Sequence, residues 1–335
     1  MFRKIAQPET VNALLAKFRD LASPTAFIDP VYAKVAIETE PANFPGRPPR
    51  ELYGDANTEP DYTSIAKNYG LEFKGGGERI AVLVNPPSLD DKPFFDMGAN
   101  LKLAGVTSVD IAAAKKGKIL GTDGKPVTNP FYDLAVIGGV VTADDKLILG
   151  TRGRRFGKEL TADRVMTMAD NCYALAPGGG ATFRFEGNPL EYTLFHEAQE
   201  ELALTRSEIN GYGLDGLFLA KQIGPIGLKA VYRVRTTLDS TEILDRHERG
   251  LARYTELCTA GKKQDEVADQ LVKEGLAPDV WEHSKLEALS LDETLDRLGK
   301  MTPNMQNPLE NKACGIGVGA ILTLLKSDIL WNQVP

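Results

Sequence analysis

The chain contains little cysteine and little histidine. Its 335 residues include three cysteines, Cys172, Cys258 and Cys314, and three histidines. The cysteines are widely separated and odd in number, so the sequence predicts neither a disulfide framework nor a cysteine-based zinc site. Free thiols are typical of proteins in a reducing compartment. We therefore expect a cytoplasmic protein that relies on its hydrophobic core for stability.

An excess of positive charge is also missing. The chain has 39 Lys and Arg against 46 Asp and Glu, which gives a formal net charge of −7. Nucleic-acid-binding domains carry clustered positive charge, so we expect no nucleic-acid partner. A small anionic substrate remains compatible with this charge because a bound divalent cation can supply local positive charge.

Long apolar runs are absent as well. Residues 1–8 lack the apolar segment of a secretory signal. The longest apolar run, residues 313–325, is too short and too rich in glycine to span a membrane. Hydrophobic residues make up 42% of the chain and charged residues 25%. This composition is typical of a soluble globular protein, and we expect no membrane association.

Apolar periodicity predicts an α+β fold, or a layered α/β/α arrangement. Residues 1–127 are interpreted as an N-terminal extension or small domain of unknown role. Residues 128–335 form the second predicted domain, with a helical insertion near 240–275. Residues 106–114 fit a strand or a helix, and residues 240–274 fit one helix or two separated at Gly261. The other predicted helices are 8–21, 189–204, 291–298 and 313–330, and the predicted strands are 79–84, 134–141, 147–151, 172–175, 214–220, 229–236 and 281–286.

The predicted helix over residues 189–204 carries three carboxylates, Glu197, Glu200 and Glu201. Residues three and four positions apart are neighbours on a helix, with Cβ atoms roughly 5–6 Å apart, and like charges at that spacing repel. The cluster is therefore either a solvated face or a site that expects a cation. Mg²⁺ prefers oxygen ligands and binds through a few carboxylates together with substrate phosphates.

A strand hairpin in residues 133–152, the loop Pro177-Gly178-Gly179-Gly180 and the acidic helix follow one another along the chain. In this order they resemble the Nudix hydrolases, whose box is G-x5-E-x7-R-E-U-x-E-E-x-G-U, with U a bulky aliphatic residue. The box aligns with residues 182–204. Glu197, Glu200 and Glu201 match box carboxylates, and Ala203 takes the last glycine position. The chain departs from the box where Thr182, Asn188 and His196 replace its first Gly, first Glu and Arg.

The resemblance implies a Nudix-like α/β/α sandwich with a mixed sheet. It implies hydrolysis of a diphosphate bond in a nucleoside diphosphate linked to another moiety, which is a small nucleotide-type substrate. Glu197, Glu200 and Glu201 would be catalytic and would bind Mg²⁺ (or Mn²⁺), and His196 would orient one of them. Glu186 or Glu191 could replace the carboxylate lost at Asn188.

Two further segments are candidates for binding the substrate or cofactor. Gly178 and Gly179 could offer backbone N–H groups to a phosphate or let the helix approach closely, although the same loop could be a flexible connection. Arg152, with Arg154 and Arg155, could bind phosphate or belong to a solvated loop. His247 and His283 show no ligand spacing and are interpreted as structural or surface residues.

Two other functions remain open. The altered box could belong to a catalytically impaired Nudix-like module that binds a nucleotide and acts as a sensor. Alternatively, the charged segment 240–274 could contact a partner in an interaction protein. A homodimer is possible in either case.

Overall fold

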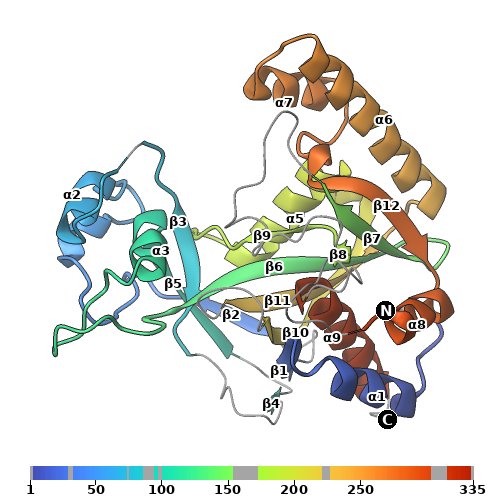
Figure 1. Cartoon of the computed structure of the whole chain (residues 1–335), viewed down its shortest axis with the longest axis horizontal. Helices are drawn as coiled ribbons and strands as arrows, with labels where there is room; N and C mark the ends of the chain where they lie inside the picture. Colours follow the sequence, from blue (N-terminus) through green and yellow to red (C-terminus); the bar gives the residue numbers. More distant parts are fainter. Residues whose placement is uncertain are drawn as a thin grey trace.

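The structure is a computed structural model that describes residues 3–28, 33–73, 75–85, 94–96, 100–153, 173–220, 227–302 and 315–332. It is a mixed α+β structure in which a curled sheet runs through the whole molecule (Figure 1). Strand β6 (Tyr132–Val141) crosses the middle of the view, with helices above, below and to the left of it. The sheet therefore organises the rest of the fold.

The described strands pair in the order β2-β5-β3-β6-β11-β10-β1-β4, and a branch adds β9, β7, β8 and β12. Pairing is parallel between β6 and β11 and antiparallel between β10 and β11, so the sheet is mixed. The strands not yet given are β1 (Ala22–Ile28), β2 (Lys34–Ile37), β3 (Arg79–Leu83), β4 (Phe94–Asp96), β5 (Asn100–Thr107), β7 (Leu147–Arg152), β8 (Tyr173–Leu175), β9 (Gly178–Gly180), β10 (Ile209–Ala220), β11 (Leu228–Thr236) and β12 (His283–Leu289).

Helices cover both faces of the sheet. Successive strand side chains point to opposite faces, and in β6 Val136 and Val140 pack into the core cluster that contains helix α5 (Pro189–Leu202). Ile137 and Val141 pack into the cluster that contains α9 (Gly315–Asn332). Helices α1 (Pro8–Phe18) and α8 (Leu291–Lys300) contribute to that second cluster.

Two adjacent glycines of β6 allow helices to approach from both sides. A Cβ atom at Gly138 would lie 2.9 Å from Leu194 of α5, and one at Gly139 would overlap Leu324 of α9. Real Cβ atoms do not come this close to other atoms. Helices α5 and α9 can therefore pack at this distance from the sheet only because both positions are glycine. This brings α5 onto the central strands.

A lobe around α2 (Tyr62–Asn68) and α3 (Ser108–Lys115) lies at the left of Figure 1, and its core is formed by residues between 42 and 119. Its core includes Asp110, which is fully buried and accepts hydrogen bonds from Tyr53 (2.8 Å), Tyr69 (2.7 Å) and Thr107. A short η1 helix (Arg50–Tyr53) completes the lobe. Thr107 donates from both its backbone N–H and its hydroxyl, so four hydrogen bonds satisfy the oxygen atoms of this buried side chain.

Strands on both sides of residue 127 share the sheet. β1 pairs with β10, and β3 pairs with β6. The division into a 1–127 extension and a 128–335 domain stays a prediction, and the described strand pairs cross that boundary.

Several predicted elements differ from the structure in detail. Residues 106–114 are neither one strand nor one helix: β5 ends at Thr107, whose side chain caps α3 in a capping box with Asp110. The segment 240–274 is two helices, α6 (Ser240–Thr259) and α7 (Gln264–Lys273), separated at Gly261 with φ +79°. The predicted strand at 281–286 begins later, because Trp281 lies in the short η3 helix (Val280–Glu282).

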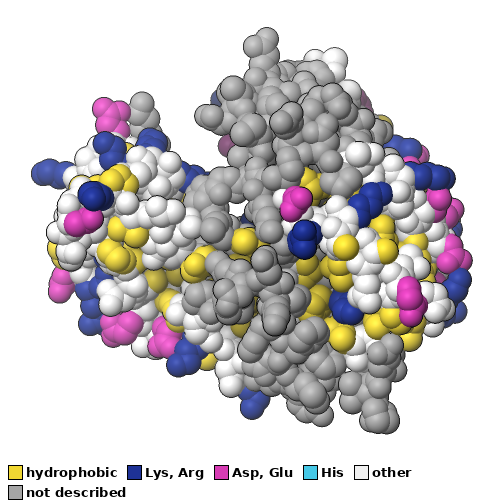
Figure 2. All heavy atoms as spheres, turned by 60° about the horizontal axis from the view of Figure 1, so that its bottom comes forward, with side chains coloured by type: hydrophobic (Ala, Val, Ile, Leu, Met, Phe, Trp, Pro, Cys, Tyr) yellow, Lys and Arg dark blue, Asp and Glu magenta, His cyan; other side chains and the backbone are white. Residues whose placement is uncertain are grey.

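The surface bears on two expectations about partners. None of the helices in the described part of the chain has both the length and the apolar character needed to cross a bilayer. On the face drawn in Figure 2, basic and acidic side chains are interspersed and neither sign forms a continuous patch. The absence of a nucleic-acid partner stays a prediction.

Candidate functional site

Helix α5 has clear signals at both ends. Asn188 is the N-cap and accepts a hydrogen bond from the backbone N–H of Leu190 at 3.0 Å, and Pro189 occupies the first turn. Both residue types are favoured at these positions. The helix ends at Ala203, which has a left-handed conformation with φ 52°. Its buried residues Leu190, Leu194 and Ala198 face the sheet.

Glu197, Glu200 and Glu201 lie at the C-terminal end of α5 and form what we call the carboxylate cluster. The C-terminus of a helix carries partial negative charge, and no basic residue occupies the last turn of α5. Three acidic side chains at this end are therefore electrostatically unfavourable without a cation or another source of positive charge.

Glu201 is the buried member of the cluster, with a residue exposure of 1%. Its Oε1 atom accepts a hydrogen bond from the backbone N–H of Gly178 at 3.3 Å. Its Oε2 atom lies 2.8 Å from Nε2 of His283, which comes from the first position of β12. Burial raises the pKa of Glu201 to about 7, against the opposing effects of Arg152 and the Gly178 N–H.

Glu197 packs against the glycine loop. A Cβ atom at Gly179 would overlap the Glu197 carboxylate, whereas a Cβ atom at Gly180 would meet nothing within 4 Å. Burial, together with the charges of Glu201 and Glu200, raises the pKa of Glu197 to about 8. The lack of a side chain at position 179 thus allows the loop and the helix to approach this closely, whereas a role of Gly179 in binding a phosphate stays a prediction.

Glu200 is the most exposed member of the cluster, with 31% of its side chain accessible. His196 lies one turn earlier, with Nε2 at 3.5 Å from Oε1 of Glu200. Burial raises the pKa of Glu200, the charge of His196 opposes that shift, and Asp279 and Glu282 add to it. His196 therefore stands beside one carboxylate of the cluster, consistent with an orienting contact.

Two carboxylates and one histidine near the cluster were missed by the sequence analysis. Asp279 is the N-cap of η3 and Glu282 is its last residue, and the backbone N–H of Asp279 donates to the Glu200 carbonyl at 2.9 Å. Burial raises the pKa of Glu282, and Arg152 opposes the shift. The only local signal was the predicted strand 281–286, which contains Glu282 and His283 and follows Asp279, and it gave no indication that these residues lie beside α5.

Arg152 is an ion-pair partner within the site. Its Nη1 atom lies 2.8 Å from Oε2 of Glu282, and only 15% of the Arg152 side chain is exposed. Arg154 and Arg155, the rest of the predicted basic cluster, lie outside the described residues. The geometry thus places the Arg152 charge beside acidic side chains, where it offsets their mutual repulsion.

The residues fit a hard divalent cation by their chemistry. Carboxylate oxygens are the donors that Mg²⁺ prefers. Burial is the main cause of the raised pKa of Glu197 and Glu200, and a cation would offset the further contribution from neighbouring carboxylates. Within the described residues, however, no group of three or more His, Cys, Asp or Glu side chains is arranged to hold a metal ion. In particular, both Glu201 oxygens are engaged by protein donors.

The position of the first box Glu is used for helix capping. Besides accepting from Leu190, Asn188 donates to Oε1 of Glu191 at 3.0 Å, and Glu191 Oε2 accepts from the Tyr212 hydroxyl at 3.1 Å. These contacts hold Glu191 at the N-terminal end of α5. Glu191 therefore does not join the carboxylate cluster, and Glu186 is exposed.

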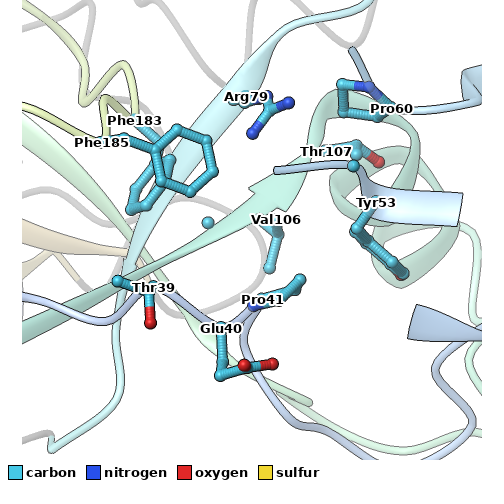
Figure 3. A pocket seen from close by; sticks show the side chains of 12 residues that line it. Thr39, Glu40, Pro41, Tyr53, Pro60, Arg79, Val106, Thr107, Phe183 and Phe185 are labelled. Carbon is cyan, nitrogen blue, oxygen red and sulfur yellow. The ribbon is translucent and has the colours of Figure 1, made fainter. Parts of the chain in front are cut away.

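A separate cavity lies where the N-terminal lobe meets the segment before α5 (Figure 3). Phe183 and Phe185 form one wall, and Arg79 lies over the Phe185 ring at 4.8 Å. The cavity measures about 20 Å³, which is room for about one water molecule. It is too small for a substrate, and none of the cluster carboxylates lines it.

Comparisons with known proteins give limited information. No protein-family model matches the sequence, and no curated protein matches it. Among solved structures, DR0079 from Deinococcus radiodurans is 15% identical, with 70% of this chain and 97% of that chain covered and a TM-score of 0.33. A MutT protein from Methanosarcina mazei Go1 is 14% identical, with 60% and 96% covered and a TM-score of 0.30. At these TM-scores, the likeness assigns neither a family nor an activity to the chain.

Proposed function

We propose that the protein is a metal-dependent hydrolase of the Nudix type, built on an α/β/α sandwich. It would cleave a diphosphate bond in a nucleoside diphosphate linked to another moiety. The observation that carries the proposal is the carboxylate cluster at the C-terminal end of α5, packed against Gly178 and Gly179. The box resemblance of residues 182–204 supports the same function.

In this proposal each residue has a distinct task. Glu197 and Glu200, with Glu201, would hold Mg²⁺ (or Mn²⁺), which when bound neutralises charge on a diphosphate and lowers the pKa of a water molecule. His196 orients Glu200, from which it lies 3.5 Å away. Arg152, paired with Glu282 at 2.8 Å, limits the repulsion among the acidic side chains.

The test is a phosphate-release screen with Mg²⁺ and with Mn²⁺. The compounds are nucleoside diphosphate sugars, dinucleotides, nucleoside triphosphates and coenzyme A derivatives. We expect turnover of at least one class, and a loss of at least about 100-fold in Glu200→Gln and Glu201→Gln, as is typical when a charged catalytic group is removed. Glu248→Gln, on the surface of α6, is the matched control and should leave the rate unchanged. Full activity in both cluster variants would contradict the proposal.

A second function is favoured by the contacts of Asn188. Asn188 stands where the family box has its first Glu, and its bond to Glu191 keeps that carboxylate away from the cluster, so the site has one carboxylate fewer than the box. A module that binds a nucleotide without cleaving it would fit this loss. Tight nucleotide binding by calorimetry, with no phosphate release at millimolar Mg²⁺ or Mn²⁺, would support this function over hydrolysis.

A further inference from the structure

His283 makes a buried contact with the carboxylate cluster from a distant part of the chain. The residue has 0% exposure, and its Nε2 atom lies 2.8 Å from Oε2 of Glu201, 82 positions earlier in the sequence. A side chain with no access to solvent loses its hydrogen bonds to water, so each polar atom must find a partner in the protein. Nε2 has a partner, whereas Nδ1 has none among the residues that the structure describes.

The unpartnered Nδ1 determines the tautomer of the ring. If Nδ1 carried the proton, a buried N–H donor would lack an acceptor, and the Nε2 lone pair would face a carboxylate oxygen. If Nε2 carries the proton, the ring donates a hydrogen bond to Glu201. Only the Nδ1 lone pair then lacks a partner, which costs less than a buried N–H donor without an acceptor. The neutral ring protonated at Nε2 therefore satisfies more of the buried polar atoms than the other neutral tautomer does.

The ring is also held in place from other sides. A Cβ atom at Gly150 of β7 would overlap the ring at Nδ1, so the glycine backbone closes off that edge. The His283 carbonyl lies 3.0 Å from Nε2 of His247 on α6. Antiparallel pairing of β12 with β7 sets His283 opposite Arg152. The ring cannot shift without disturbing a strand pair and a helix contact.

We propose that His283 is a positioning residue that fixes the orientation of the Glu201 carboxylate, an inference that rests on the proposed metal-dependent function. The bond to His283 and the Gly178 N–H together engage both oxygens of Glu201. Each carboxylate oxygen has a second lone pair, so a carboxylate oriented in this way can still take a cation. Partners that orient metal-binding carboxylates contribute about 10–100-fold to metal affinity.

The first experiment measures the dissociation constant of Mn²⁺ alone by electron paramagnetic resonance in the full chain. His283→Gln keeps a donor near the position of Nε2, whereas the shorter His283→Asn does not reach Glu201. We expect Mn²⁺ binding within about 3-fold of the parent for His283→Gln and weaker by about 10–100-fold for His283→Asn. Equal Mn²⁺ affinity in the parent and His283→Asn, or an equal loss in both variants, would overturn the inference. The unfolding midpoint of each variant shows whether a loss of Mn²⁺ affinity comes from a misfolded protein or from a reoriented Glu201 carboxylate.

A second experiment needs neither metal nor turnover. ¹⁵N chemical shifts of the histidine rings report which nitrogen carries the proton. We expect the Nε2–H tautomer at His283, with a resonance that moves in Glu201→Gln and stays in place in Glu248→Gln. The Nδ1–H tautomer would overturn the inference even if hydrolysis is observed. If the parent neither binds Mn²⁺ nor releases phosphate, the proposed function fails, and the ring shifts still decide whether His283 holds Glu201.

Discussion

Two neighbouring glycines in β9 differ in what surrounds their Cα atoms. An added methyl group at Gly179 would collide with the Glu197 carboxylate, and one at Gly180 would extend into open space. We predict that Gly179→Ala lowers phosphate release by about 10–100-fold, because a displacement of about 1 Å at a catalytic group can cost that much. Gly180→Ala should retain the parental rate. Equal rates in the two variants would show that the position of Glu197 does not matter.

A second residue-scale prediction concerns the acid stability of the fold. Burial lowers the pKa of His247 to about 4, and the neighbouring His283 adds to the shift. Between pH 6.5 and pH 4 the unfolded chain therefore binds a proton at this residue that the folded chain does not. Acidification through this window should lower the free energy of unfolding by up to about 1.4 kcal/mol per pH unit.

The variant His247→Gln isolates this effect, since it retains a donor for the His283 carbonyl and does not titrate. Urea unfolding of both proteins at several pH values gives the difference in stability. We expect the difference to be constant above pH 7 and to turn against the parent below pH 6.5. Parallel profiles down to pH 4 would contradict a lowered pKa.

At the scale of elements, helix α5 ends on a strained residue. Ala203 has φ 52°, a conformation that costs an L-residue with a Cβ atom roughly 1–2 kcal/mol. We predict that Ala203→Gly raises the free energy of unfolding by about 1 kcal/mol. Ala198→Gly, in the interior of the same helix, should instead lower it by about 1 kcal/mol or more. Urea unfolding measures both, and a loss of stability in Ala203→Gly would contradict the prediction.

Elements with strong local signals could be predicted from the sequence. Apolar periodicity predicted α5 close to its observed bounds, and the structure adds the N-cap Asn188 and the first-turn Pro189 as local signals of its start. β1 was missed because Pro24 lies in it, at a register irregularity against β10, and proline usually argues against a strand. The break between β5 and α3 was missed although Thr107 and Asp110 form a capping box with a recognisable spacing.

The candidate site could be predicted only in the part that one helix supplies. Glu197, Glu200 and Glu201 lie close to one another because residues three and four positions apart in the sequence are neighbours on one helix. Arg152, Glu282 and His283 reach them through the pairing of β7 with β12, whose residues are separated by more than 130 positions in the sequence. Pairing partners at such separations are set by tertiary packing, which no local pattern encodes.

At the scale of the whole molecule, a buried ionic network ties the C-terminal helix to the sheet. Arg233 of β11 lies 2.7 Å from Asp215 of β10 and 3.2 Å from Asp328 of α9. Ser327 of α9 also donates to Asp215 at 2.8 Å. Both carboxylates are almost fully buried. The network thus connects two strands and the helix that covers them.

We predict that Arg233→Met destabilises the protein by about 3–5 kcal/mol, because it removes the guanidinium group that pairs with the buried Asp215 carboxylate. Arg253→Met is the control, since the partners of Arg253, Glu256 and Glu274, lie on the surface of the helical pair α6 and α7. Surface ion pairs contribute little, so its unfolding midpoint should hardly move. Similar midpoints for the two variants would mean that the network is not important for stability.

The long sequence separation between Glu201 and His283 also has a consequence for the order of synthesis. Helix α5 leaves the ribosome well before β12, with α6 and α7 made in between. Until β12 joins β7, the Glu201 side chain has no histidine partner and no strand to bury it. A nascent chain that ends before residue 283 can therefore fold its acidic helix but cannot complete the pocket around its innermost carboxylate. The site is therefore completed only after β12 has been synthesised and has paired with β7.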